Sequence, residues 1–233
     1  MDKAPVKKKI YIVYEDQNIL IVNKPSGRLV VPARPDDKND LTSILNLTFQ
    51  AGGLNIKAHP CHRLDRETSG LVIFAKGKKI QKIMMQQFHK RQVKKAYIAF
   101  IQGYLKEKSG MLKSYIEKPW PYPRRRGRGK LAMTKFKVLK EANGFSVVEL
   151  EPLTGRTNQI RLQFKDLGHP LLGERRFSFA RDWPIKFRRT ALHAWRVEFL
   201  HPVTAEKLSL VAPLSQDMKD FLVKEKVFLD KLI

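Results

Sequence analysis

The chain has 233 residues, of which 42% are hydrophobic, so it is long enough to bury a sizeable core and too apolar to be mostly disordered. Its 46 Lys and Arg residues outnumber its 22 Asp and Glu residues, which gives a formal net charge of +24. This excess indicates a polyanionic partner, and nucleic acid is the leading candidate. A weaker interpretation, at this density of charge, is that the basic residues serve only solubility. An anionic membrane surface is also weaker, because no lipidation motif or basic anchor helix is present.

The positive charge is concentrated in one part of the chain. Residues 51–130 contain 20 basic and 4 acidic residues, a net of +16, whereas residues 1–50 give +2 and residues 131–233 give +6. A single cysteine, Cys61, excludes an intramolecular disulfide and a multi-cysteine metal site. The N-terminal sequence lacks the long apolar segment of a signal peptide or membrane-spanning helix, so we expect a cytoplasmic protein.

The first half of the chain predicts three strands and two helices. Strand-like runs at 10–14 and 19–23 come first, and Asp40 is placed to cap a helix over 41–50 that two glycines end. The apolar run 71–75 predicts a strand buried on both faces. Residues 78–92 predict a helix with a core-facing stripe, formed by Ile80, Ile83, Met84 and Phe88.

The second half begins with a strand at 93–105, on which Tyr97, Ala99 and Ile101 share one face and Ile98 and Phe100 the other. A basic loop at 118–130 precedes a hairpin at 131–153, whose turn is Asn143-Gly144. A helix capped by Thr157 follows, with Ile160, Phe164 and Leu167 facing inward and Gly168 ending it. The last elements expected are strands within 189–202 and 207–213 and a helix begun by Ser215.

Asp65 is the most informative single residue. It stands between Arg63 and Arg66 in the stretch CHRLDRETSGLVIFAK, inside the most basic third of the chain. By itself it could form an Asx-turn or a surface ion pair. A carboxylate flanked by guanidinium groups stays ionised, which also suits a nucleophile or a general base.

Other site chemistries find little support in the sequence. There is no acid pair for glycoside hydrolysis and no metal-ligand set such as H-E-x-x-H, and GRGK at 127–130 lacks the spacing of a phosphate loop. Cys61 and His62 would point to opposite faces of an extended segment, so each is interpreted as packing or as contacting RNA. An enzyme acting on a base must extract that base from its stack. Tyr97 could receive it and Arg63 could fill the gap, although these two could equally be a core aromatic and a phosphate contact.

The stretch HRLDRETSGLVIFAK resembles H-R-L-D-x-x-T-S-G-L, the signature of the RluA family of pseudouridine synthases. Five further segments are similar to the family in the same order: ILIVNKPSGRLVVP, KKAYIAF, LAMTKFKVL, LTGRTNQIRLQF with GHPLLGE, and TALHAWRVEFLHP. Together they span roughly residues 10–215, and so many ordered matches make coincidence implausible.

The resemblance implies an RNA-uridine isomerase that needs neither metal nor cofactor and acts on tRNA or rRNA. Asp65 would be the catalytic aspartate, attacking either the uracil ring or the ribose carbon. Arg63 would fill the space of the flipped base, Tyr97 would stack on the uracil and help remove its C5 proton, and Arg161 would pair with Asp65. Further RNA contacts are expected from His62, Arg66, Arg124, Arg125, Arg126, Arg128, Lys130, Arg156 and Asn158.

The chain departs from the family pattern at four positions. Asn158 stands where the family usually has histidine, and Gln163 where another histidine is common. Glu174 replaces an aspartate and Phe177 replaces the usual tyrosine. We expect none of the four to contact the three catalytic candidates, and therefore expect activity to survive.

We expect one catalytic domain over residues 1–233, of α+β class, with a mixed, largely antiparallel sheet flanked by helices and loops. The active-site cleft is expected to cross the sheet, with residues 51–130 as one wall. No separate RNA-binding module is expected ahead of the catalytic domain. The alternatives are a non-catalytic RNA-binding or ribosome-assembly chaperone with the same fold, and a DNA-binding protein, for which no recognition-helix motif is present. RNA is the expected partner, with no membrane and no obligate protein partner.

Overall fold

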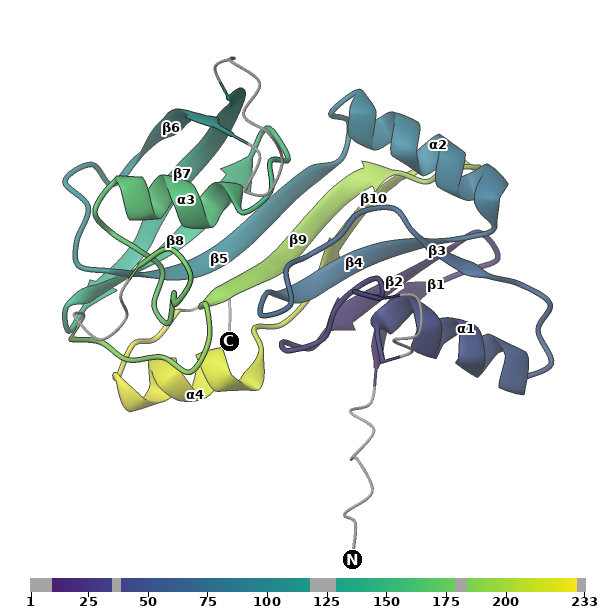
Figure 1. The fold of residues 1–233 in the computed structure, drawn as a ribbon, viewed down its shortest axis with the longest axis horizontal. Helices are drawn as coiled ribbons and strands as arrows, with labels where there is room; N and C mark the ends of the chain where they lie inside the picture. The colour runs from purple at the N-terminus through teal and green to yellow at the C-terminus, as the bar shows by residue number, and fades with distance from the viewer. Residues whose placement is uncertain (1–9, 35–38, 118–128, 179–183, 230–233) are drawn as a thin grey trace, which may run out of the picture.

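The computed structural model describes residues 10–34, 39–117, 129–178 and 184–229, which form a ten-stranded sheet with four helices packed on it (Figure 1). Every strand pair in these residues is antiparallel except β4 with β9, so the expected α+β class with a mixed, largely antiparallel sheet is confirmed. In sheet order the strands are β1 (Tyr11–Glu15), β2 (Ile19–Lys24), β4 (Ser69–Lys76), β9 (Leu192–Leu200), β5 (Lys94–Gln102), β8 (Phe145–Pro152), β7 (Lys130–Ala142) and β6 (Ser109–Ile116), with β3 (Ala58–Pro60) on β4 and β10 (Lys207–Val211) on β9.

The helices cover the two faces of the sheet in pairs. Helices α1 (Leu41–Ala51) and α3 (Gln159–Asp166) pack on one face, and α2 (Lys78–His89) and α4 (Gln216–Lys224) pack on the other. The central strands divide their side chains between the faces, because successive residues of a strand point in opposite directions. On β4, Val72 packs with α1, whereas Ile73 packs with α2.

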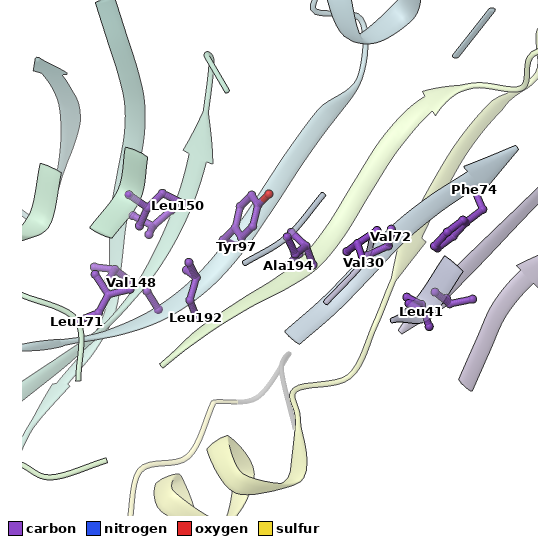
Figure 2. Close-up of a cluster of buried hydrophobic side chains, with 14 of the residues drawn as sticks. Val30, Leu41, Val72, Phe74, Tyr97, Val148, Leu150, Leu171, Leu192 and Ala194 are labelled. Carbon is purple, nitrogen blue, oxygen red and sulfur yellow. The ribbon is translucent and has the colours of Figure 1, made fainter. Parts of the chain in front are cut away.

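The largest core cluster lies on the α1 and α3 face and crosses the whole sheet. Figure 2 shows it running from Leu41 and Phe74 through Ala194 and Tyr97 to Leu150. The predictions for these strands are confirmed. Residues 69–75 of β4 are all buried, and Tyr97, Ala99 and Ile101 of β5 belong to this cluster, while Ile98 and Phe100 pack with α4 on the opposite face.

Local signals in the sequence placed several element ends correctly. The side chain of Asp40 accepts a hydrogen bond from the backbone of Ser43 at 3.1 Å, so the expected cap of α1 is present. Asn143 and Gly144 have φ angles of 50° and 84° in the tight turn between β7 and β8. Helix α4 begins directly after Ser215, as expected.

The prediction for α3 is partly wrong. Its N-cap is Asn158, in the left-handed region with a φ of 55°, and not Thr157. The turn is stabilised instead by Gln159, whose Oε1 accepts hydrogen bonds from the Thr154 hydroxyl at 2.7 Å and the Arg156 amide at 3.0 Å. Because α3 ends at Asp166, its inward stripe stops at Phe164, and Leu167 is 44% exposed.

Two strands were not expected from the sequence. β3 has three residues, one of them proline, and β6 lies at the edge of the sheet with most of its residues exposed, so neither has a strong apolar pattern. In the part of the chain that the structure describes, no helix combines the length and hydropathy needed to span a bilayer.

Candidate active site

Asp65 lies in the loop between β3 and β4, and this loop is held through its backbone. The Thr68 amide donates to the Asp65 carbonyl at 3.2 Å, and the next carbonyl, that of Arg66, accepts from the Gly27 amide at 2.8 Å. The Asp65 side chain keeps 32% of its surface exposed. The loop is therefore fixed in place while its carboxylate stays accessible.

Lys24, at the end of β2, also holds this loop. Its side chain is fully buried, and Nζ donates to the carbonyls of Arg66 at 3.1 Å, Pro25 at 3.1 Å and Arg28 at 2.7 Å. Burial, together with the nearby Arg189, lowers the pKa of Lys24 to about 7, while the charge of Asp65 acts in the opposite direction. The sequence analysis missed this residue, although a lysine that ends the apolar strand ILIVNK was a usable signal.

Arg161 reaches Asp65 from α3, as expected. Its Nη1 is 3.3 Å from Asp65 Oδ2 and also donates to Asn158 Oδ1 at 3.1 Å. The rest of its guanidinium group binds Glu174 in a two-point ion pair, with Nε to Oε2 at 2.6 Å and Nη2 to Oε1 at 2.8 Å. The ring of Phe177 lies 4.9 Å from the guanidinium carbon.

Glu174 fixes the position of Arg161. Its side chain is 1% exposed, and Oε1 also accepts the backbone amides of Arg176 at 2.8 Å and Phe177 at 3.2 Å. Burial acts to raise the pKa of Glu174, but Arg161 and these amides together lower it below its usual value. The pKa of Arg161 is raised, because Glu174 and Asp65 outweigh the effect of burial. Both partners of this buried pair are therefore charged at neutral pH.

The expectation that the four departures from the family pattern avoid the site is wrong for three of them. Asn158, Glu174 and Phe177 all contact Arg161. Asn158 does so from the N-cap of the same helix, one turn before Arg161, whereas Glu174 and Phe177 come from the chain after α3. Gln163 lies elsewhere. It accepts the hydroxyl of Thr134 at 2.6 Å and donates to the Ala132 carbonyl at 3.2 Å, which joins α3 to β7.

Tyr97 lies on β5 beside the small residue Ala194 of β9, at a bulge in the pairing of these two strands. The side chain is 8% exposed within the main core cluster. Burial, and to a lesser degree the charge of Asp65, raise the pKa of Tyr97 well above its usual range. Its hydroxyl is therefore protonated at neutral pH, which makes a phenolate base unfavourable here.

The expected RNA-binding residues occupy different settings. Arg63 and Arg66 are exposed on either side of Asp65, and Lys130 is exposed at the start of β7. Arg156 is half-buried and donates from Nε to the Leu131 carbonyl at 3.1 Å. Arg66 also lines a polar hollow of about 240 Å³ beside the loop after β2. Arg124, Arg125, Arg126 and Arg128 lie outside the described residues. RNA contact by all of these residues stays a prediction.

Cys61 and His62 pack into the protein. Burial raises the pKa of the Cys61 thiol to about 12, which makes it a poor nucleophile at neutral pH. His62 Nε2 accepts the Ile73 amide at 3.1 Å, and burial lowers its pKa to about 3. RNA contact by His62 stays a prediction, and its accepting nitrogen is already bonded to β4. Among the described residues, no group of three or more His, Cys, Asp and Glu side chains is gathered for a metal ion.

Comparisons with known proteins identify the family of the chain. Residues 18–166 match the family described as RNA pseudouridylate synthase. The chain is similar to a Bacillus subtilis protein named "Uncharacterized RNA pseudouridine synthase YhcT", with 37% identity over 90% of this chain and 70% of the relative. A Pasteurella multocida relative, named "Dual-specificity RNA pseudouridine synthase RluA", is 36% identical over 90% of this chain and 95% of its own length.

Among solved structures, "Human RNA Pseudouridylate Synthase Domain Containing 4" is similar, with a TM-score of 0.79 and 24% identity over 94% of both chains. At that level of identity the similarity concerns the fold alone. It places the sheet and its helices in the same architecture as the human domain.

Proposed function

Because the chain belongs to the RluA family of RNA pseudouridine synthases, which isomerise uridine in RNA, we propose that Asp65 is the residue with which it performs this reaction. The observation that best supports this proposal is the environment of Asp65. Its carboxylate is accessible and lies 3.3 Å from Arg161, which the buried Glu174 holds in place. An arginine held from behind keeps its partner aimed in one direction, as a reacting carboxylate requires.

In the proposed reaction, Asp65 attacks the target nucleotide at the uracil ring or at the ribose C1′. The bond from N1 to C1′ breaks, the uracil turns, a new bond forms from C5 to C1′, and the bond between Asp65 and the nucleotide breaks. C5 then loses its proton to solvent, and N1 takes up a proton, so the product is an isomer of uridine. Asp65 leaves unchanged at the end of the cycle.

The target base must leave its stack to reach a residue held in this way. Arg63 is exposed two residues before Asp65, where its flat guanidinium group can fill the space that the base leaves. Tyr97 offers the ring on which the uracil stacks. With its raised pKa, Tyr97 acts as a stacking and hydrogen-bonding group and not as the base that removes the C5 proton.

We take tRNA and rRNA as the substrate classes, because bases in loops of structured RNA can be splayed out and read individually. The name of the Pasteurella multocida relative, which describes a dual-specificity RNA enzyme, supports testing more than one class. The chain is proposed to act as one catalytic domain over residues 1–233, so the whole chain is the enzyme to be tested.

The deciding experiment measures tritium release from tRNA and rRNA transcripts labelled at uridine C5. The wild-type protein should release tritium, whereas Asp65→Asn should be slower by at least about 10³-fold and bind the same RNA within a few-fold. Asp166→Asn is the matched control, because Asp166 is a 60% exposed carboxylate paired only with its neighbour Lys165 among the described ion pairs. Near-normal release by Asp65→Asn would refute the proposed role of Asp65.

A further inference from the structure

Arg189 lies three residues before the start of β9 and is nearly buried, with 6% of its surface exposed. Its Nη1 points at backbone carbonyls, those of Glu67 at 2.9 Å, Thr190 at 2.9 Å and Leu192 at 3.3 Å. Glu67 is two residues after Asp65, so Arg189 holds the loop that carries the reacting carboxylate.

The other side of the Arg189 guanidinium group is fixed by α4. Nε donates to Asp217 Oδ2 at 2.6 Å, Nη2 donates to Oδ1 at 3.0 Å, and Nη2 also donates to the Ser215 hydroxyl at 2.7 Å. Burial acts to raise the pKa of Asp217, but Arg189 outweighs it and lowers that pKa below its usual value. An arginine held by two parallel hydrogen bonds has one orientation, so its Nη1, which does not bind Asp217, is aimed at the carbonyl of Glu67 in the loop.

The side chain of Glu67 adds a second connection between the same two segments. Its Oε2 accepts the amide of Thr190 at 2.8 Å and the Thr190 hydroxyl at 2.9 Å. The preceding carbonyl, that of Arg66, accepts Lys24 Nζ at 3.1 Å. Two buried side chains, Lys24 of β2 and Arg189 from the segment before β9, therefore hold the two consecutive carbonyls that follow the Asp65 carbonyl.

We propose that Arg189 is a positioning residue for Asp65, acting through the Glu67 backbone, and that Asp217 of α4 sets its orientation. This inference rests on the proposed role of Asp65. A backbone carbonyl cannot move without its neighbours, so releasing carbonyl 67 turns the loop and displaces the carboxylate from Arg161. Displacement of a reacting group by about 1 Å is enough to cost about 10²-fold in rate. Both residues lie outside the stretch 18–166 that matches the family description.

The test compares Arg189→Lys with the wild-type protein in the tritium-release assay. Lysine keeps the charge and the ion pair with Asp217 but has one compact ammonium group, which cannot bind Asp217 at two points and reach the Glu67 carbonyl as well. The expected result is a fall in kcat of about 10-fold to 100-fold, with KM and RNA affinity within about threefold. Arg196→Lys is the matched control, because Arg196 on β9 pairs with Glu149 on a more exposed surface and should keep wild-type kcat.

Two further variants distinguish a positioning role of Arg189 from a purely structural one. Asp217→Asn weakens the orientation of Arg189 without removing it, so its kcat should fall between those of wild type and Arg189→Lys. Val227→Ala removes two methyl groups from the core beside α4 and lowers the Tm, but below its melting transition it should keep wild-type kcat. Thermal melting and circular dichroism give the folded fraction of each variant.

The inference is overturned if folded Arg189→Lys turns over within twofold of wild type, or if its loss of activity follows its folded fraction as in Val227→Ala. These outcomes are distinct from failure of the proposed function. Activity of Asp65→Asn would refute the proposed role of Asp65 itself. An inactive Asp65→Asn variant together with a fully active Arg189→Lys variant would refute only the proposed role of Arg189.

Discussion

At the scale of single residues, Arg161 binds two carboxylates unequally. Glu174 takes two short hydrogen bonds at 2.6 and 2.8 Å in a nearly closed environment, and Asp65 takes one at 3.3 Å while keeping 32% of its side chain exposed. The arginine is thus held mainly by Glu174, and its contact with Asp65 is the weaker one. A carboxylate that must form and break a bond with a nucleotide is better matched by such a partner than by a tight two-point pair.

Glu174→Gln tests this division of roles. The substitution keeps the shape of the side chain but leaves the buried Arg161 with a single charged partner, so we expect the free energy of unfolding to fall by about 3 kcal/mol. The kcat of isomerisation should fall by at least about 10-fold, because Arg161 is no longer fixed. Urea unfolding and tritium release give the two quantities.

Glu149→Gln is the control for Glu174→Gln. Glu149 pairs with Arg196 at 3.4 Å, and the two side chains are 26% and 40% exposed, so the change should cost about 0–1 kcal/mol and leave kcat unchanged. An unfolding free energy of Glu174→Gln equal to that of Glu149→Gln would contradict the view that Glu174 holds Arg161.

At the scale of elements, the site depends on the short parallel contact between β4 and β9. Ser69 pairs with His193 and Gly70 with Ala194, and Ala194 pairs on its other side with Tyr97 of β5. This contact brings the loop of Asp65 next to Tyr97. Gly70 has a φ of +111°, and a Cβ there would lie 2.6 Å from the backbone nitrogen of Ala194 and closer still to its carbonyl oxygen.

Gly70→Ala should therefore separate β4 from β9. We expect a loss of about 2–5 kcal/mol in the free energy of unfolding, from the left-handed backbone and the overlap with β9 together, and a lower kcat because Asp65 moves away from Tyr97. Gly77→Ala separates the two causes, since Gly77 has a φ of +101° with no atom within 4 Å of the added Cβ. Equal losses in the two variants would show that close packing against β9 is not the reason for glycine at position 70.

At the scale of the whole molecule, the net charge is +24 and is concentrated in residues 51–130, the region where we predict that RNA binds. Binding of a basic surface to phosphates releases counterions, so affinity falls with salt in proportion to the number of phosphates contacted. Asp65, the carboxylate proposed to react, lies within this positive region. It is paired with Arg161, whereas Arg63 and Arg66 beside it are exposed and left for the predicted contact with phosphates.

Salt titration of RNA binding can assign such contacts. We expect Arg66→Gln to reduce the slope of log K against log salt concentration by about 0.7 to 0.9, the value of one phosphate contact. Lys224→Gln changes the net charge equally, but it lies at the end of α4 on the opposite face, so it should leave the slope unchanged. Equal changes in the two variants would mean that overall charge, and not contact at the site, governs binding.

Signals that depend on a few neighbouring residues were read correctly from the sequence. The Asp40 cap, the Asn143-Gly144 turn, the doubly buried strand β4 and the two faces of β5 all follow from local backbone preference and from the alternation of apolar residues. The start of helix α3 was misread, because its N-cap is Asn158 and the turn before it is held by the side chain of Gln159. Its end was read correctly, since Gly168 follows the C-cap with a φ of 83°.

By itself the sequence determined the α+β class and the RluA family, and it marked Asp65, Tyr97 and Arg161, because these depend on composition, periodicity and an ordered set of motifs. Only the tertiary structure decided what surrounds Asp65. Lys24, Glu174 and Arg189 reach its loop or its partner from positions 41, 109 and 124 residues away along the chain (65 − 24, 174 − 65 and 189 − 65). No local pattern encodes such contacts, since they arise where β2, the chain after α3 and the segment before β9 meet.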